Sequence, residues 1–189
     1  IPVINGLTDL EHPCQVMADL LTIEEKKGRL GGLKLAYVGD GNNMAHSLMD
    51  GGAKFGMHVA VACPAGFEPN PGVLERAQRV AVMNGGSVAV LHDPVTAVQG
   101  ADVVYTDVWA SMGQEAEAAQ RRQCFGDFQV NGPLMRLARQ DAIFLHCLPA
   151  HRGEEVTADV IDGPQSVVFD QAENRLHVQK AIMAVTMAG

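Results

Sequence analysis

Phe144-Leu145-His146-Cys147-Leu148-Pro149 is the stretch that decides the fold, because a short apolar run breaks there into a polar loop. Residues 142–145 are apolar, which is typical of a strand in a parallel sheet covered on both faces. Pro149 predicts the end of that strand, since proline lacks the N–H that a strand ladder needs. His146 and Cys147 are therefore expected at the carboxyl edge of a sheet, where open α/β sheets bind ligands.

Similar strand patterns recur along the chain, and helical patterns separate them. The expected strands are residues 33–38, 59–62, 87–91, 103–106, 142–145 and 166–169. The expected helices are residues 10–27, 44–49, 73–83, 95–100, 114–124, 132–139 and 176–188. Alternation of this kind predicts an α/β fold, a doubly wound, Rossmann-like parallel sheet with flanking helices and right-handed crossovers.

Composition limits the kinds of partner. The chain has 189 residues, enough for one domain with a substantial core, and carries 14 Lys and Arg against 22 Asp and Glu. An acidic chain gains nothing from counterion release, so no nucleic-acid partner is expected. No apolar run approaches the roughly 20 residues that span a bilayer, so no membrane partner is expected either.

The cysteines are scattered and form no Cys-x-x-Cys pair. They stand at Cys14, Cys63, Cys124 and Cys147. This spacing argues against a disulfide scaffold and fits a reducing compartment, so the expected location is the cytoplasm, or the mitochondrial matrix in a eukaryote. His146, Cys147 and His151 lack metal-ligand spacing, so neither a metal nor another cofactor is expected.

Polar stretches follow several predicted strands directly. They are Gly39-Asp40-Gly41-Asn42-Asn43, the loop that opens with Asp107, and the stretch that ends in Glu173-Asn174-Arg175. In a parallel sheet such loops emerge at one edge, so together with Cys147 they are expected to form a polar pocket.

The expected pocket suits a zwitterionic amino acid beside an anionic second substrate. Asp107 can pair with an ammonium group, Asn43 can bond a carboxylate, and Arg175 offers planar bidentate donors. His12 and Gln15 lie three apart on a predicted helix and can face one spot. Each residue alone also fits a plainer role, as a helix cap or a solvated charge.

The glycine-containing loop at residues 39–43 superficially resembles a dinucleotide fingerprint. The third glycine is absent, however, and the next predicted strand ends in Cys63-Pro64 without the acidic residue that would hold a ribose. A nucleotide-binding dehydrogenase is therefore disfavoured. The loop is expected to bind a small carboxylate or phosphate, or simply to turn tightly.

Four motifs together resemble the ornithine carbamoyltransferases of the aspartate/ornithine carbamoyltransferase family. They are His12-Pro13-Cys14-Gln15, Gly39-Asp40-Gly41-Asn42-Asn43, Asp107 with Ser111-Met112-Gly113, and Phe144-Leu145-His146-Cys147-Leu148-Pro149. The resemblance covers essentially the whole chain. It implies carbamoyl transfer from carbamoyl phosphate to the side-chain amine of L-ornithine, giving L-citrulline and phosphate, in a homotrimer or a multiple of trimers.

The resemblance also implies residue roles. Ornithine would contact Asn43, Asp107, Ser111 and Met112. Carbamoyl phosphate would contact His12, Gln15, Cys147, Leu148 and Arg175. Cys147 is expected to act in catalysis as an amine-contacting or proton-accepting group rather than a nucleophile, because phosphate leaves well without a covalent enzyme intermediate.

The resemblance further implies a domain organisation. Residues 29–170 are expected to form the ornithine-binding domain, whereas residues 1–28 and 171–189 are helices that belong with a carbamoyl-phosphate domain. The Ser-Thr-Arg-Thr phosphate loop of the family does not occur in the sequence. The chain is therefore expected to be a carboxyl-terminal part, without that amino-terminal domain, and inactive alone.

Other functions stay open. Aspartate carbamoyltransferase shares the His-Pro-x-Gln helix, but an aspartate site should present cations where Asp107 and Cys147 stand. A carbamoyltransferase for a related amine, such as an acylated ornithine, is harder to separate, because loop shape sets the room for an acyl group. A non-catalytic amino-acid-binding module is the alternative from another class.

Overall fold

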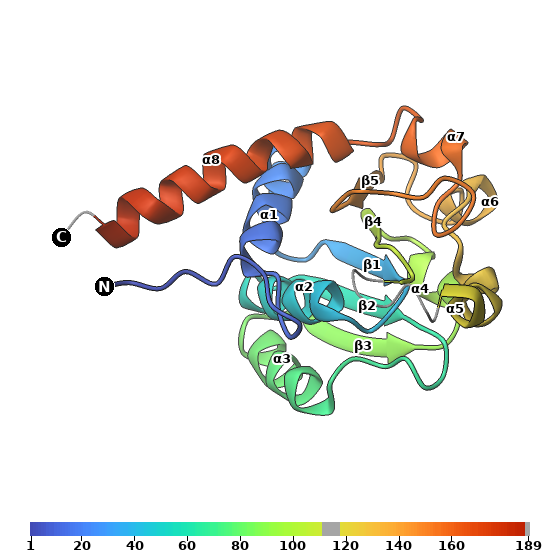
Figure 1. The fold of residues 1–189 in the computed structure, drawn as a ribbon, viewed down its shortest axis with the longest axis horizontal. Helices are drawn as coiled ribbons and strands as arrows, with labels where there is room; N and C mark the ends of the chain where they lie inside the picture. Colours follow the sequence, from blue (N-terminus) through green and yellow to red (C-terminus); the bar gives the residue numbers. More distant parts are fainter. Residues whose placement is uncertain (111–117, 188–189) are drawn as a thin grey trace.

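Five parallel strands form one sheet in the order β3-β2-β1-β4-β5 (Figure 1). The computed structural model describes residues 1–110 and 118–187. The strands are β1 (Lys34–Val38), β2 (His58–Ala62), β3 (Ser87–Leu91), β4 (Val103–Thr106) and β5 (Ile143–His146). The predicted parallel α/β sheet is thereby confirmed.

Helices cover both faces of this sheet. They are α1 (Pro13–Lys27), α2 (Asn43–Lys54), α3 (Pro71–Met83), α4 (Pro94–Val98), α5 (Ala118–Phe125), the 3-10 helix η2 (Gly126–Phe128), α6 (Gly132–Met135), α7 (Ala158–Ile161) and α8 (Val168–Met187). Helices α1, α2 and α3 pack on one face, and α4, α6 and α7 pack on the other. Helix α8 packs along α1.

The central strand shows why the sheet is buried on both sides. Successive side chains of a strand point to opposite faces. In β1, Leu35 and Tyr37 join the core beneath α1, α2 and α3, whereas Ala36 and Val38 join the core on the opposite face. All four side chains are at most 1% exposed, so the apolar run needs cover on both faces.

Helix α1 carries clear end signals. Pro13 occupies the first turn, where a missing N–H costs little, and His12 precedes the helix, which begins at Pro13 rather than at the predicted residue 10. At the other end, Gly28 adopts a left-handed conformation with φ 73° and closes the helix, as its sequence position predicts. These ends fix where His12 and Gln15 lie relative to the sheet.

The strand predicted at residues 166–169 is wrong. Ser166 pairs with Phe144 through an isolated bridge, and α8 begins at Val168. The stretch that ends in Arg175 therefore lies inside α8 rather than in a loop after a strand. Other predicted helix ends shift by smaller amounts; for example, α2 continues to Lys54, and α6 stops at Met135.

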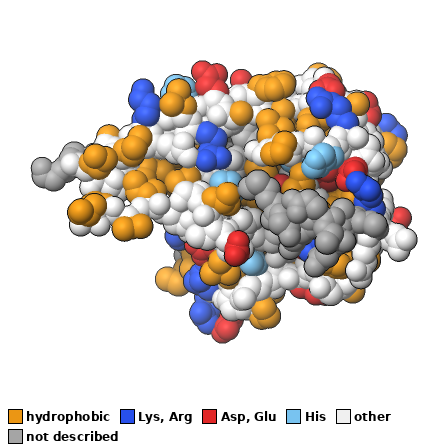
Figure 2. All heavy atoms as spheres, viewed as in Figure 1, with side chains coloured by type: hydrophobic (Ala, Val, Ile, Leu, Met, Phe, Trp, Pro, Cys, Tyr) orange, Lys and Arg blue, Asp and Glu red, His pale blue; other side chains and the backbone are white. Residues whose placement is uncertain are grey.

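Helix α8 projects beyond the body of the molecule, on the side where both termini lie (Figure 1). Its exposed apolar side chains include Leu176, Met183, Val185 and Met187. Figure 2 shows apolar side chains gathered on the projecting end. Among the described helices, α8 included, none is long and apolar enough to cross a membrane.

Candidate ligand-binding site at the carboxyl edge of the sheet

The sheet order brings the expected site residues to one place. From β1 the chain crosses to β2 on one side, whereas from β4 it proceeds to β5 on the other side. Such a reversal between neighbouring strands leaves a crevice at their carboxyl ends. Asp107 follows β4 directly at this crevice, and Cys147 follows β5.

The Asn42-Asn43 pair divides its roles in a way the sequence did not reveal. Asn42 caps α2, because its Oδ1 accepts a hydrogen bond from the Met44 N–H at 2.9 Å. Its Nδ2 donates to Asp107 Oδ2 at 2.9 Å, so the cap also belongs to the candidate site. Asn43, the residue predicted to bind ornithine, lies in the first turn and donates from Nδ2 to the Thr8 carbonyl at 2.7 Å.

Gly41 owes its identity to a close backbone approach. Its N–H donates to the Phe67 carbonyl at 2.9 Å. A Cβ at this position would lie 2.3 Å from the Pro69 nitrogen, so no larger residue fits without displacing the backbone. This contact indicates that the glycine-containing loop serves to turn the chain tightly, rather than to bind a carboxylate or phosphate.

Asp107 and Cys147 form the centre of the site. The Cys147 thiol donates to Asp107 Oδ1 at 3.0 Å, and Asp107 is only 7% exposed. Burial, with the adjacent Asp107 carboxylate, raises the pKa of Cys147 well above its ordinary value. Because the thiolate is the reactive form, a thiol that stays protonated at neutral pH is a poor nucleophile.

His146 holds the loop that carries Cys147. Its Nδ1 accepts from the Leu148 N–H at 2.8 Å, so a neutral ring bears its proton on Nε2, which lies 3.3 Å from Glu155 Oε1. Leu148 has a positive φ of 57° and precedes a cis bond to Pro149. A bulky residue in this backbone region is uncommon, and such residues cluster at functional sites.

Within residues 1–110 and 118–187, two groups of side chains have the ligand types that a metal requires. Asp107, His146 and Cys147 place ligand atoms within 4.8 Å of one another, although their spacing along the chain gave no sign of it. Both ring nitrogens of His146 already take part in hydrogen bonds, so a metal there would have to replace one of them. The second group, nearer the surface, is His151, Glu154 and Glu155.

Helices α1 and α8 bring together the other predicted residues. Arg175 Nη1 donates to Gln15 Oε1 at 2.5 Å. His12 Nδ1 lies 3.1 Å from the Gly6 carbonyl and must donate to it, which leaves Nε2 of a neutral ring as an acceptor. Burial, with the charge of Arg175, lowers the pKa of His12, and the charge of Asp107 acts in the opposite direction. The charges of Arg175 and Asp107 therefore both act on the His12 ring.

Sequence reasoning missed two buried residues of this region, Asp19 and Gln171. Asp19 Oδ1 accepts from Gln15 Nε2 at 2.8 Å and from Gln171 Nε2 at 2.7 Å. Burial raises the pKa of Asp19 to about 7, against the opposing hydrogen bonds of both glutamines. The four-residue spacing between Gln15 and Asp19 was the available signal, because it places both on one helix face.

The structure therefore describes seven of the nine predicted site residues. They are His12, Gln15, Asn43, Asp107, Cys147, Leu148 and Arg175. The other two, Ser111 and Met112, lie outside the described residues. The described ones divide between the crevice beside β4 and the place where the amino-terminal turn of α1 meets the first half of α8.

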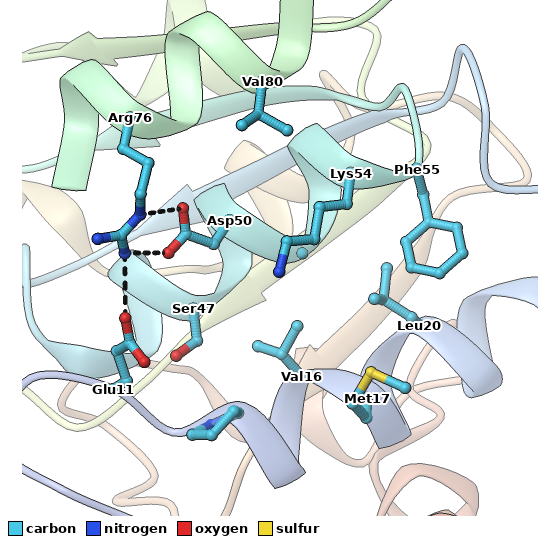
Figure 3. A pocket seen from close by; sticks show the side chains of 12 residues that line it. Glu11, Val16, Met17, Leu20, Ser47, Asp50, Lys54, Phe55, Arg76 and Val80 are labelled. Atoms are coloured by element: carbon cyan, nitrogen blue, oxygen red, sulfur yellow. Dashed lines mark hydrogen bonds and ion pairs between the residues drawn. The ribbon is translucent and has the colours of Figure 1, made fainter. Parts of the chain in front are cut away.

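A separate hollow of about 330 Å³ lies between α1, α2 and α3 (Figure 3). At one end Arg76 bonds Asp50 at 2.5 Å and Glu11 at 3.0 Å, and the opposite wall is largely apolar. None of the seven predicted site residues that the structure describes lines it. The convergent polar groups lie elsewhere, at the carboxyl edge of the sheet.

Known proteins match the chain over its whole length. Residues 31–186 match the family described as aspartate/ornithine carbamoyltransferase, Asp/Orn binding domain, and residues 1–25 match its carbamoyl-P binding domain. The ornithine carbamoyltransferase of Symbiobacterium thermophilum is 71% identical over 188 residues, which cover 100% of this chain and 61% of that protein. The solved ornithine carbamoyltransferase from Pyrococcus furiosus is 62% identical with a TM-score of 0.97, covering 100% of this chain and 60% of that one. The chain thus spans less than two thirds of these relatives' length.

Proposed function

Since the chain belongs to the aspartate/ornithine carbamoyltransferase family, we propose that its protein transfers a carbamoyl group from carbamoyl phosphate to the side-chain amine of L-ornithine. The products are L-citrulline and phosphate. One observation carries the proposal: the Arg175 that bonds Gln15 and the Asp107 that bonds Cys147 are both near enough to His12 for their charges to shift its pKa, in opposite directions. An amine-binding carboxylate therefore stands beside a cationic group suited to phosphate.

The ornithine half of the proposed site is anionic. In this proposal Asp107 receives the α-ammonium group of ornithine, because a nearly buried carboxylate with two side-chain donors already in place is a preorganised partner for a cation. Asn43, Ser111 and Met112 contact the rest of the amino acid. Asn43 Nδ2 donates one of its two hydrogens to the Thr8 carbonyl, so we assign its second hydrogen to the substrate carboxylate.

The carbamoyl-phosphate half is built from His12, Gln15, Cys147, Leu148 and Arg175. The attacking amine must be neutral, although a free alkylamine has a pKa of about 10.4, and the site must stabilise an oxyanion as the amine adds. Arg175 supplies positive charge for that purpose. The Cys147 thiol already holds its proton, so we assign it to contact and orient the amine rather than to accept a proton.

The domain arrangement is part of the same proposal. Residues 29–170 bind ornithine, whereas residues 1–28 and 171–189 pack on the carbamoyl-phosphate-binding domain. The family match of residues 1–25 and the exposed apolar side chains on the projecting end of α8 support this division. The homotrimer and the cytoplasmic location stay predictions, which sedimentation and cell fractionation of the full-length protein would test.

Product analysis of the full-length protein tests the proposed reaction. With carbamoyl phosphate and L-ornithine we expect citrulline and phosphate in equal amounts, and no product with L-aspartate. Turnover of Nα-acetylornithine but not of ornithine would replace the proposal by the acylated-amine alternative. Binding of ornithine without any product would identify a non-catalytic amino-acid-binding protein.

A further inference from the structure

A buried carboxylate, Asp19, lies where α1 packs on α8, a position that an apolar side chain would normally occupy. Asp19 is 0% exposed, and Gln15 and Gln171, which both donate to its Oδ1, are 1% exposed. Burying a charged group costs free energy, and an apolar side chain in its place is often as stable or more so. The carboxylate therefore calls for a role other than holding two helices together.

Asp19 determines which end of the Gln15 amide faces the site. Asp19 Oδ1 accepts hydrogen bonds from both glutamines, so Gln15 must turn its NH₂ group toward Asp19, at 2.8 Å. The amide oxygen then faces Arg175, which donates to it at 2.5 Å. With an acceptor at one end and a donor at the other, the amide has one satisfied orientation.

Gln171 extends the network to the loop of Cys147. Its Nε2 donates to Asp19 Oδ1 at 2.7 Å and to the Tyr105 hydroxyl at 3.0 Å, and its Oε1 accepts from the His146 N–H at 3.0 Å. His146 directly precedes Cys147. Asp19 is thus the point at which α1, α8 and the end of β5 are tied together.

We propose that Asp19 is a positioning residue, which holds the Gln15 side chain with its amide oxygen toward the ligand. Through Gln171, Asp19 also fixes the position of Gln15 relative to the loop that carries Cys147. The proposal rests on the proposed function, in which Gln15 meets the carbamoyl group. A carbamoyl NH₂ is a hydrogen-bond donor and needs an acceptor, which only this orientation of the amide supplies. Asp19 itself touches no substrate.

A neighbouring polar cluster provides a matched control. Asn174 donates to Thr22 Oγ1 at 3.0 Å and to Glu25 Oε2 at 2.8 Å, across the same interface of α1 and α8. Asn174 is also buried, at 5% exposed, but it makes no hydrogen bond to Gln15 or Gln171. A purely structural role for Asp19 predicts that both sites behave alike on substitution.

The test compares three variants of the full-length protein by calorimetric titration with carbamoyl phosphate, without ornithine. Asp19→Leu should weaken carbamoyl-phosphate binding about tenfold, which is the loss expected when the hydrogen bond between Gln15 and the carbamoyl group is no longer formed. Asp19→Asn keeps an acceptor for Gln15 and should stay within about threefold of the unmodified protein. Asn174→Leu should lower the melting temperature and leave binding unchanged. Equal weakening by Asp19→Leu and Asn174→Leu, or unchanged binding in folded Asp19→Leu, would overturn the proposal.

A crystal structure of the Asp19→Leu protein separates this proposal from the proposed function. We expect the Gln15 side chain to leave its position against Arg175. If it stays, Asp19 does not position it, whatever the protein binds. If the unmodified protein fails to bind carbamoyl phosphate, the proposed function is wrong, while the displacement of Gln15 still decides the role of Asp19. Should Asp19→Leu not fold, Asp19→Ser, whose side chain is too short to reach Gln15, takes its place in both measurements.

Discussion

Replacing Asp107 by asparagine should weaken ornithine binding in the full-length protein far more than carbamoyl-phosphate binding. Asp107 now accepts from Asn42 Nδ2 at 2.9 Å and from the Cys147 thiol at 3.0 Å. An asparagine NH₂ would face one of these donors, and the charge that attracts an ammonium group would be lost. A hydrogen bond to a charged group contributes about 1.5–3 kcal/mol, which corresponds to roughly tenfold to a hundredfold in affinity.

The assay is calorimetric titration of each substrate with folded protein, checked by thermal unfolding. Asp93→Asn is the matched control, because Asp93 caps α4 on the surface and asparagine caps helices equally well. We expect ornithine affinity to fall by the stated factor in Asp107→Asn alone. Equal weakening of both substrates, or an equal effect in the control, would refute the assignment of Asp107 to the ammonium group.

Three further predictions concern pH, reactivity and stability. Burial raises the pKa of Asp19 from 3.8 to about 7, so the folded protein binds this proton more tightly and its unfolding free energy falls as the pH rises through that interval. Asp19→Asn should abolish that fall in urea titrations at several pH values, and parallel curves for the two proteins would contradict it. Because the Cys147 thiol stays protonated, iodoacetamide at neutral pH should alkylate the exposed Cys124 first, and Cys147→Ser should retain turnover with a raised KM for ornithine; a carbamoyl thioester on Cys147 would disprove this role. Arg121→Met, which leaves the nearly buried Asp40 without its ion pair at 2.6 Å, should cost about 3–5 kcal/mol of unfolding free energy, and a loss below about 1 kcal/mol would show that the pair contributes little.

The sheet was predictable because its signal is local. Strands such as β1 and β4 are short apolar runs bounded by glycine or polar residues, and the structure places them within a residue of the predicted ends. The strand predicted at 166–169 failed because an apolar run of that length is equally a strand or the buried first turn of a helix. Only the packing of Val168 into the core decided between the two.

The site was predictable as a set of loops but not in its hydrogen bonds. The sequence could not say which of Asn42 and Asn43 caps α2, because either amide suits a helix start. The spacing places Asp19 on the helix face of Gln15, but it does not show that this carboxylate is buried, because buried carboxylates are rare. The partners that allow this burial, Gln15 and Gln171, are brought together by the packing of α8 on α1, far from any local pattern.

Asn42 gives the first turn of α2 a further property. The same side chain caps the helix through Oδ1 and bonds Asp107 through Nδ2, and the Tyr37 hydroxyl donates to its oxygen at 3.3 Å. A cation that binds Asp107 competes with Asn42 for the lone pairs of that carboxylate. Binding therefore changes the strength of the hydrogen bond by which Asn42 caps α2. The hydrogen-exchange rate of the Met44 amide therefore reports whether a cation is bound at Asp107, and no label has to be attached at the sheet edge.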